Sequence, residues 1–150
     1  MKRIVVRRTL NAPIDRVFAA LADYESYAGL TGVRRARLLR HGRSRRLGVG
    51  AVREMWTTLA FFREQITAYL PPHRLDYRII ASQPRLDHAG ASVQLEEVKG
   101  GTRVTWTTSF RVHLPAALGI VGTSIAAWQT RRGLVTLLTA LASQLEAVPA

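Results

Sequence analysis

The 150-residue sequence contains no cysteine, so disulfide bonds, thiolate metal ligands and cysteine nucleophiles are all excluded. Its histidines are His41, His73, His88 and His113, and no two of them stand in a His-x-His or His-x-x-x-His spacing. The sequence therefore predicts no metal site. A Gly-x-Ser-x-Gly motif is also missing, and no Ser/His/Asp grouping can be proposed from spacing, so nothing supports a serine nucleophile. We expect the protein to need no cofactor.

Long hydrophobic runs are missing as well. Residues 1–16 carry charges but no apolar stretch long enough for a signal peptide. The most apolar segment, residues 114–129, contains two glycines and is shorter than the ~20 residues of a membrane-spanning helix. We therefore expect a cytoplasmic protein with no membrane span. With 47% hydrophobic and 21% charged residues, the chain is typical of one folded domain covering residues 1–150.

Acidic residues are scarce. The chain has 10 Asp+Glu against 22 Lys+Arg, a net charge of +12, and every basic residue except Lys2 and Lys99 is arginine. The densest basic run is RRARLLRHGRSRR, residues 34–46. Such an excess is typical of nucleic-acid binders, because neutralising phosphates releases counterions, but an arginine-rich codon bias gives the same composition. Side chains alternate between the two faces of a strand, and this alternation predicts that most of the charge lies on the outer face or in a loop. Binding to nucleic acid or another acidic surface is therefore a remote alternative.

Hydrophobic periodicity predicts an α+β protein. Period-two alternation predicts strands over 2–10, 34–41, 49–57, 60–70, 74–82, 88–98 and 102–112. A short amphipathic helix is predicted after Asn11, its expected N-cap, and YESYAGL predicts a second short helix. A long helix is predicted over 115–147, with a buried stripe of Val121, Ile125, Trp128, Val135, Leu138, Ala142 and Leu145. We expect a curved seven-stranded antiparallel sheet wrapped around the long helix, with the short helices closing one end.

Several local motifs resemble one family in chain order. NAPIDRVFAALADYESY, residues 11–27, resembles a family opening in which Ala-Pro starts a helix that ends in Leu-x-Asp and an aromatic residue. GAVREM, REQI, PPHRLDYRI and GGTRVTWTTSF resemble successive strands of the polyketide cyclase/dehydrase and lipid-transport branch of the SRPBCC superfamily, also called START-related or Bet v 1-like. The resemblance covers about residues 4 to 146 and implies a helix-grip fold. It also implies a largely apolar cavity between the sheet and the long helix, which holds a hydrophobic small molecule.

Strand pairing predicts which side chains face that cavity. In a symmetric hairpin, the residue numbers of any two paired residues add up to the same total, so the position of the turn gives the pairs. The predicted pairs are Arg53–Glu64, Tyr77–Ile66, Trp106–Leu95 and Thr108–Val93, from reversals at Thr58-Leu59, Pro71-Pro72 and Gly100-Gly101. The predicted cavity residues are Arg53, Met55, Phe62, Glu64, Ile66, Tyr77, Ile79, Val93, Trp106, Thr108, Phe110 and Trp128. This set is an apolar wall that carries one cation, one carboxylate, a phenol and a hydroxyl.

The polar members of this set have two interpretations that the sequence leaves open. Arg53 and Glu64 form either an ion pair that fixes strand register or a polar pair that orients a ligand carbonyl or phenol, with Tyr77 as a further donor. Arg53, Glu64 and Tyr77 are therefore the candidate catalytic residues. His88 is a weaker candidate, since the parity of strand 88–98 points it outward unless a bulge at AGA reverses it.

Three functional hypotheses follow. The favoured one is a carrier or sensor of a lipid, polyketide or similar apolar metabolite, because no unambiguous acid/base pair is present. The second is a cyclase/aromatase-type enzyme, in which the cavity fixes the shape of a poly-ketone chain and Arg53, Glu64 and Tyr77 assist enolisation or dehydration. The third is the nucleic-acid or acidic-surface interaction. We expect a monomer or a homodimer, with a hydrophobic small molecule as the partner.

Overall fold

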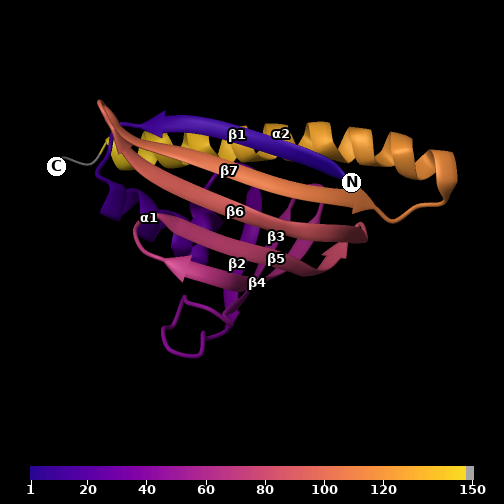
Figure 1. Cartoon of the computed structure of the whole chain (residues 1–150), viewed down its shortest axis with the longest axis horizontal. Coiled ribbons are helices and arrows are strands. Elements are labelled where there is room, and N and C mark those ends of the chain that lie inside the picture. The colour runs from indigo at the N-terminus through magenta and orange to yellow at the C-terminus, as the bar shows by residue number, and fades with distance from the viewer. Residues whose placement is uncertain (148–150) are drawn as a thin grey trace.

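The computed structural model describes residues 1–147, and its elements follow the predicted order (Figure 1). The strands are β1 (Lys2–Leu10), β2 (Val33–Arg40), β3 (Val52–Thr57), β4 (Phe61–Leu70), β5 (Arg74–Gln83), β6 (Leu86–Val98) and β7 (Gly101–Val112). The helices are α1 (Ile14–Ala22), the 3-10 helix η1 (Tyr24–Gly29) and α2 (Ala116–Glu146). The largest boundary differences are at β3, which begins at Val52 rather than 49, and β6, which begins at Leu86 rather than 88.

All seven strands form one antiparallel sheet in the order β1-β7-β6-β5-β4-β3-β2. Helix α2 packs against β1 and β7, and α1 lies near the C-terminal end of α2 (Figure 1). The core fills the space between the concave face of the sheet and these helices. The predicted helix-grip class, with two short helices after the first strand, is confirmed.

Helix α1 forms because its apolar residues recur at helical spacing. Ile14, Val17, Phe18 and Leu21 are all buried on its inner face. The prediction that Asn11 caps this helix is wrong. Pro13 occupies the cap position, with φ −62°, and no side chain caps the helix. Asn11 instead donates its backbone N–H to the carboxylate of Glu146 at 2.8 Å, which ties the end of β1 to the end of α2.

The predicted buried stripe of α2 is wrong over the first half of the helix. The residues buried there are small, Gly119, Thr123 and Ala127, whereas the large apolar side chains point to solvent. The helix packs too closely here for larger residues, since a Cβ at position 119 would lie 2.7 Å from the carbonyl oxygen of Leu114. Thr123 Oγ1 also accepts the Val112 N–H at 3.0 Å. In the second half, Leu138 and Ala142 are buried as predicted and Leu145 is half-buried, whereas Val135 is 46% exposed, against the prediction.

The predicted register is confirmed for the central hairpins and wrong for the last one. Arg53 pairs with Glu64, and Tyr77 with Ile66. The observed β6–β7 partners are Val93 for Trp106 and Ala91 for Thr108, two residues from the prediction. The cause is the loop, which is Lys99-Gly100, with Gly101 already in the ladder. Gly101 has φ 134°, and a Cβ there would lie 2.0 Å from the carbonyl oxygen of Leu10. A shift of two residues keeps every side chain on its predicted face.

Candidate ligand-binding cavity

A cavity of about 440 Å³ lies between the sheet and α2. Strands β2, β3, β4, β6 and β7 supply one wall, together with the β3–β4 and β5–β6 turns. The sheet-side residues are Val33, Met55, Thr57, Thr58, Leu59, Ala60, Phe62, Pro84, Leu86 and Phe110. The α2 residues are Ala126, Trp128, Gln129, Thr130, Arg132, Gly133, Leu134, Thr136 and Leu137, and Thr31 and Gly32 close one side. The wall is mostly apolar. Its polar side chains are those of Gln129, Thr130, Arg132 and Thr136 on α2 and of Thr31, Thr57 and Thr58 outside it.

Of the predicted cavity residues, Met55, Phe62, Phe110 and Trp128 line this space. The others lie in the packed interior: Arg53, Glu64, Ile66, Tyr77, Val93, Trp106 and Thr108 are buried and Ile79 is half-buried. Their part in ligand binding stays a prediction. The structure thus divides the predicted set into an apolar group at the cavity and a group that contains every predicted charge.

Apart from Trp128, the predicted set lacks the lining residues that come from turns and from α2. Strand parity says nothing about Thr58 and Leu59, which lie in the predicted turn, and Ala60 is predicted as the first residue of strand 60–70 but is not in the predicted cavity set. The predicted stripe places the wrong face of the first half of α2 toward the sheet. Gly133 could have been predicted as a cavity residue, because glycine destabilises the interior of a helix and its presence there often has a packing or functional reason. A Cβ at Gly133 would meet no atom within 4 Å, so this position opens onto free space.

A buried ion pair lies in the interior of the sheet. Arg53 Nε donates to Glu64 Oε2 at 3.0 Å, and the two side chains are only 3% and 5% exposed. The guanidinium carbon of Arg53 lies 3.8 Å from the ring centroid of Tyr24 and 5.2 Å from that of Tyr77. The hydroxyl of Tyr77 accepts the indole N–H of Trp106 at 3.0 Å. Among the described residues, Nη1 of Arg53 is buried with no hydrogen-bond partner.

The protonation of this cluster follows from burial and from the pair itself. Burial raises the pKa of the Glu64 carboxyl, and Arg53 and Tyr24 act against that rise. Burial acts to lower the pKa of Arg53, but Glu64 together with Tyr24, Tyr27 and Tyr77 outweighs it, so the guanidinium stays charged. Burial raises the pKa of the Tyr77 and Tyr24 phenols, which keep their protons. The cluster therefore holds one cation against one carboxylate, enclosed by neutral phenols.

His88 faces the concave side of the sheet, because a register shift between His88 and Gly90 reverses the parity of β6. Its Nδ1 accepts the Ile79 N–H at 3.0 Å, so the proton of the neutral ring is on Nε2. Nε2 then donates to Thr108 Oγ1 at 2.9 Å. Burial, with a contribution from Arg78, lowers the pKa of His88 to about 4. The ring is therefore neutral at physiological pH and held by two hydrogen bonds.

The outer face of the sheet holds a second charge cluster, which sequence reasoning missed. The carboxylate of Glu54 is buried between Arg37 and Arg63, whose nitrogens approach it at 2.7 Å. Burial acts to raise the pKa of Glu54, but the hydrogen bonds from these arginines lower it overall. Arg35 and Arg37 also lie over the ring of Trp56, at 5.0 and 5.7 Å. Part of the basic run 34–46 is therefore neutralised within the sheet.

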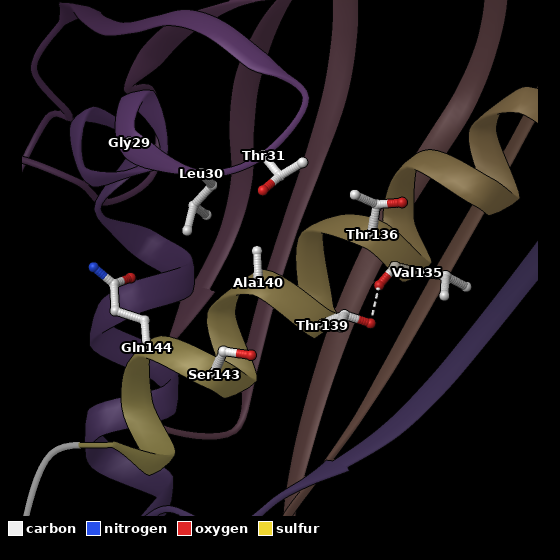
Figure 2. Close-up of a pocket in the computed structure, with 9 residues that line it drawn as sticks. All are labelled: Gly29, Leu30, Thr31, Val135, Thr136, Thr139, Ala140, Ser143 and Gln144. Atoms are coloured by element: carbon white, nitrogen blue, oxygen red, sulfur yellow. Dashed lines mark hydrogen bonds between the residues drawn. The ribbon is translucent and has the colours of Figure 1, made fainter.

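A second, shallower hollow of about 700 Å³ adjoins the cavity and shares Thr31 and Thr136 with it. Figure 2 shows Leu30 and Thr31 on one side of this groove and Ala140 and Gln144 of α2 on the other. Hydroxyl and amide groups make up much of its lining, so it is less suited to an apolar ligand than the cavity.

The sequence profile of one family, described as polyketide cyclase/dehydrase and lipid transport, matches residues 1–146. The chain belongs to this family. No curated protein matches the sequence significantly. In this member of the polyketide cyclase/dehydrase and lipid-transport family, the cavity between the sheet and α2 is a concave, largely apolar space of the kind in which small molecules bind.

Solved structures similar to this family member share its fold over nearly the whole chain. The Zhui aromatase/cyclase from a Streptomyces species has a TM-score of 0.81 at 17% identity, covering 97% of this chain and 93% of that one. A START superfamily protein from Mycobacterium smegmatis has a TM-score of 0.75 at 12% identity, covering 96% and 97%. The Aha1 dimer from Colwellia psychrerythraea has a TM-score of 0.68 at 16% identity, covering 98% of each chain. At these identities the likeness establishes the fold alone.

Metal-ligand clusters and membrane-length apolar helices are both absent from the part of the chain that the structure describes. Within residues 1–147, no group of three or more His, Asp or Glu side chains is placed to hold a metal ion. No helix in the same range is long and apolar enough to cross a membrane.

Proposed function

We propose that this protein binds a hydrophobic or aromatic small molecule, such as a lipid or polyketide, in the cavity between the sheet and α2, as a carrier or sensor. The observation that carries this proposal is the cavity of about 440 Å³ with Met55, Phe62 and Phe110 in its wall. Protein interiors normally pack without voids of this size. Small-molecule sites typically measure about 300–1,000 Å³ and are lined by apolar side chains.

The polar groups of the cavity give the ligand a preferred orientation. They come mainly from α2, where Gln129, Thr130 and Arg132 border the space. The guanidinium of Arg132 stacks over Trp128 at 4.9 Å, on the exposed side of the helix. We therefore expect a ligand whose apolar body contacts Phe62 and whose carbonyl, phenol or carboxylate end lies near Arg132.

Titration with the fluorescent probe anilinonaphthalene sulfonate tests this function, using a Gly133→Leu variant that fills the cavity from α2. Position 133 has free space around its Cβ, and leucine is a better helix former than glycine, so the fold is kept or stabilised. We expect probe affinity to fall by about tenfold or more, because the blocked site loses its apolar contact area. The matched control is Ser124→Leu, which adds the same side chain to α2 at an exposed position outside the cavity. Equal affinity in Gly133→Leu and wild type would count against the cavity as the site.

A second candidate is a cyclase/aromatase-type activity, and the buried, unpaired Nη1 of Arg53 is the observation in its favour. An enzyme of this kind needs a donor for a carbonyl oxygen and one proton-transfer group. Glu64 and Tyr77 are the candidates for proton transfer, although both already bond to neighbours in the interior. Product assays with a poly-ketone mimic test this candidate. It requires altered products in Glu64→Gln and Tyr77→Phe, and unchanged products would remove both residues from the mechanism.

A further inference from the structure

Helix α2 exposes a row of large apolar side chains along its first half. We call Leu118, Val121, Ile125 and Trp128 the outer stripe; their spacings of three and four place them on one face of the helix. They are 67%, 58%, 54% and 58% exposed. The face opposite them holds the small residues that pack on the sheet. The first turns of α2 also extend past the end of β7, so neighbouring strands do not cover them (Figure 1).

The outer stripe is larger than the scattered apolar residues that any protein surface carries. Leu114 and Ile120, beside it, are 50% and 73% exposed. Contiguous apolar patches of more than a few hundred Å² are uncommon on monomeric soluble proteins and mark interaction surfaces. The stripe therefore needs a partner that offers an apolar environment.

The charge around the outer stripe identifies that partner. From residue 114 to 145 the chain contains no acidic residue, whereas Arg131 and Arg132 directly follow the stripe. Strand β1, which packs beside α2, adds exposed Lys2, Arg3 and Arg7. Arg131 bonds to the carbonyl oxygen of Val5, so the helix and the basic strand are held together at this point. An apolar helix face with cations at its border matches the boundary between headgroups and acyl chains of an anionic membrane.

We propose that the outer stripe docks this protein onto an anionic lipid bilayer, with the first half of α2 lying in the plane of the interface. Large apolar side chains enter the acyl boundary, while Arg131 and Arg132 contact lipid phosphates. A second copy of the chain is a poorer partner, because each copy carries a net charge of +12 and a contact between two copies brings like charges together. Trp128 and Arg132 also border the cavity, so docking turns the cavity mouth toward the bilayer. This last consequence rests on the proposed function, whereas docking does not.

Co-sedimentation of the full chain with vesicles tests the docking. Phosphatidylglycerol/phosphatidylcholine vesicles should bind the protein at low salt, and pure phosphatidylcholine vesicles should bind it far more weakly. The double variant Leu118→Ser/Ile125→Ser should weaken partitioning by about tenfold for each side chain. Arg131→Gln/Arg132→Gln should weaken it by about fivefold for each arginine.

Matched controls remove the same groups elsewhere on the surface. Leu70→Ser/Ile80→Ser replaces two exposed aliphatic residues of the sheet, and Arg34→Gln/Arg40→Gln replaces two exposed arginines of β2. All four double variants should stay folded and melt within a few degrees of wild type, because they replace exposed side chains. The controls should keep most of the vesicle binding. Failure of the wild type to bind anionic vesicles at low salt would overturn the docking. So would controls that weaken binding as much as the stripe variants, or a wild-type dimer in ultracentrifugation that Leu118→Ser/Ile125→Ser abolishes.

Discussion

Replacing Glu64 with glutamine tests whether the buried ion pair holds the sheet together. The substitution keeps the shape of the side chain but leaves the Arg53 guanidinium without its carboxylate, in a position only 3% exposed. Breaking one partner of a buried pair costs about 3–5 kcal/mol. The rings of Tyr24 and Tyr77 remain over the cation and retain about 1–2 kcal/mol of attraction. We therefore expect a loss near the lower end of that range, about 3 kcal/mol.

Urea unfolding measures this loss, which corresponds to a fall of about 10 °C in melting temperature for a chain of this size. The double variant Arg53→Met/Glu64→Leu should recover most of the stability, because well-packed apolar side chains commonly replace a buried pair without loss. Glu96→Gln is the control, since Glu96 pairs with Arg103 on the surface, where the side chains are 61% and 47% exposed. It should unfold like wild type, because exposed ion pairs contribute little.

Two results would contradict a stabilising role for this ion pair. Glu64→Gln could unfold within about 1 kcal/mol of wild type, which would mean that the cation is not confined as its burial implies. Alternatively, the double variant could be no more stable than Glu64→Gln, which would mean that the lost stability does not come from an uncompensated charge. A stable double variant that still binds an apolar ligand would identify the pair as structural rather than as part of the ligand site.

Two further predictions concern the other polar clusters. His88 has a pKa of about 4 in the folded protein against about 6.5 when unfolded, so the unfolded chain binds the extra proton and stability falls as pH drops from about 6.5 to about 4. Since the ring is partly exposed, we expect this contribution to the free energy of unfolding to be about 1–2 kcal/mol. Urea unfolding of wild type and His88→Gln across this pH range measures it as the difference between the two pH profiles. Parallel profiles would contradict the prediction. Glu54→Gln should destabilise the protein by about 1 kcal/mol in the same assay, because Arg37 and Arg63 then face each other across a neutral amide; a more stable variant would contradict it.

The sequence predicts the parts of this fold that local patterns determine. Alternation of apolar and polar residues defines the strands, and the tight turn near Thr58-Leu59 fixes the pairing of Arg53 with Glu64. The predicted β6–β7 register is wrong because the prediction places both glycines in the turn. Two adjacent glycines do not indicate which of them lies in the loop and which in the strand. Close approach to the Leu10 carbonyl, a contact distant in sequence, places Gly101 in the ladder.

Tertiary packing decides what the sequence leaves open. Helix α2 is apolar on two faces, so periodicity cannot tell which of them is buried. The face with the small residues Gly119, Thr123 and Ala127 is the buried one, because these residues allow close approach to the end of β7 and to the segment that precedes the helix. The inward position of His88 depends on a bulge that parity alone does not locate. The sequence does not predict the buried position of Glu54. Its place in the strand alternation points it to the outer face, where a carboxylate is expected to be solvated unless its arginine partners are known.

Methionine-methyl NMR can detect ligand binding in the cavity at a single side chain of its wall. The chain has only two methionines, Met55 in the cavity wall and Met1, which is 66% exposed at the N-terminus. On titration with anilinonaphthalene sulfonate, the Met55 methyl signal should shift and show cross-peaks to the aromatic protons of the probe. The Met1 signal should stay in place as an internal control. Saturation with the probe while the Met55 signal stays unchanged would contradict binding in this cavity.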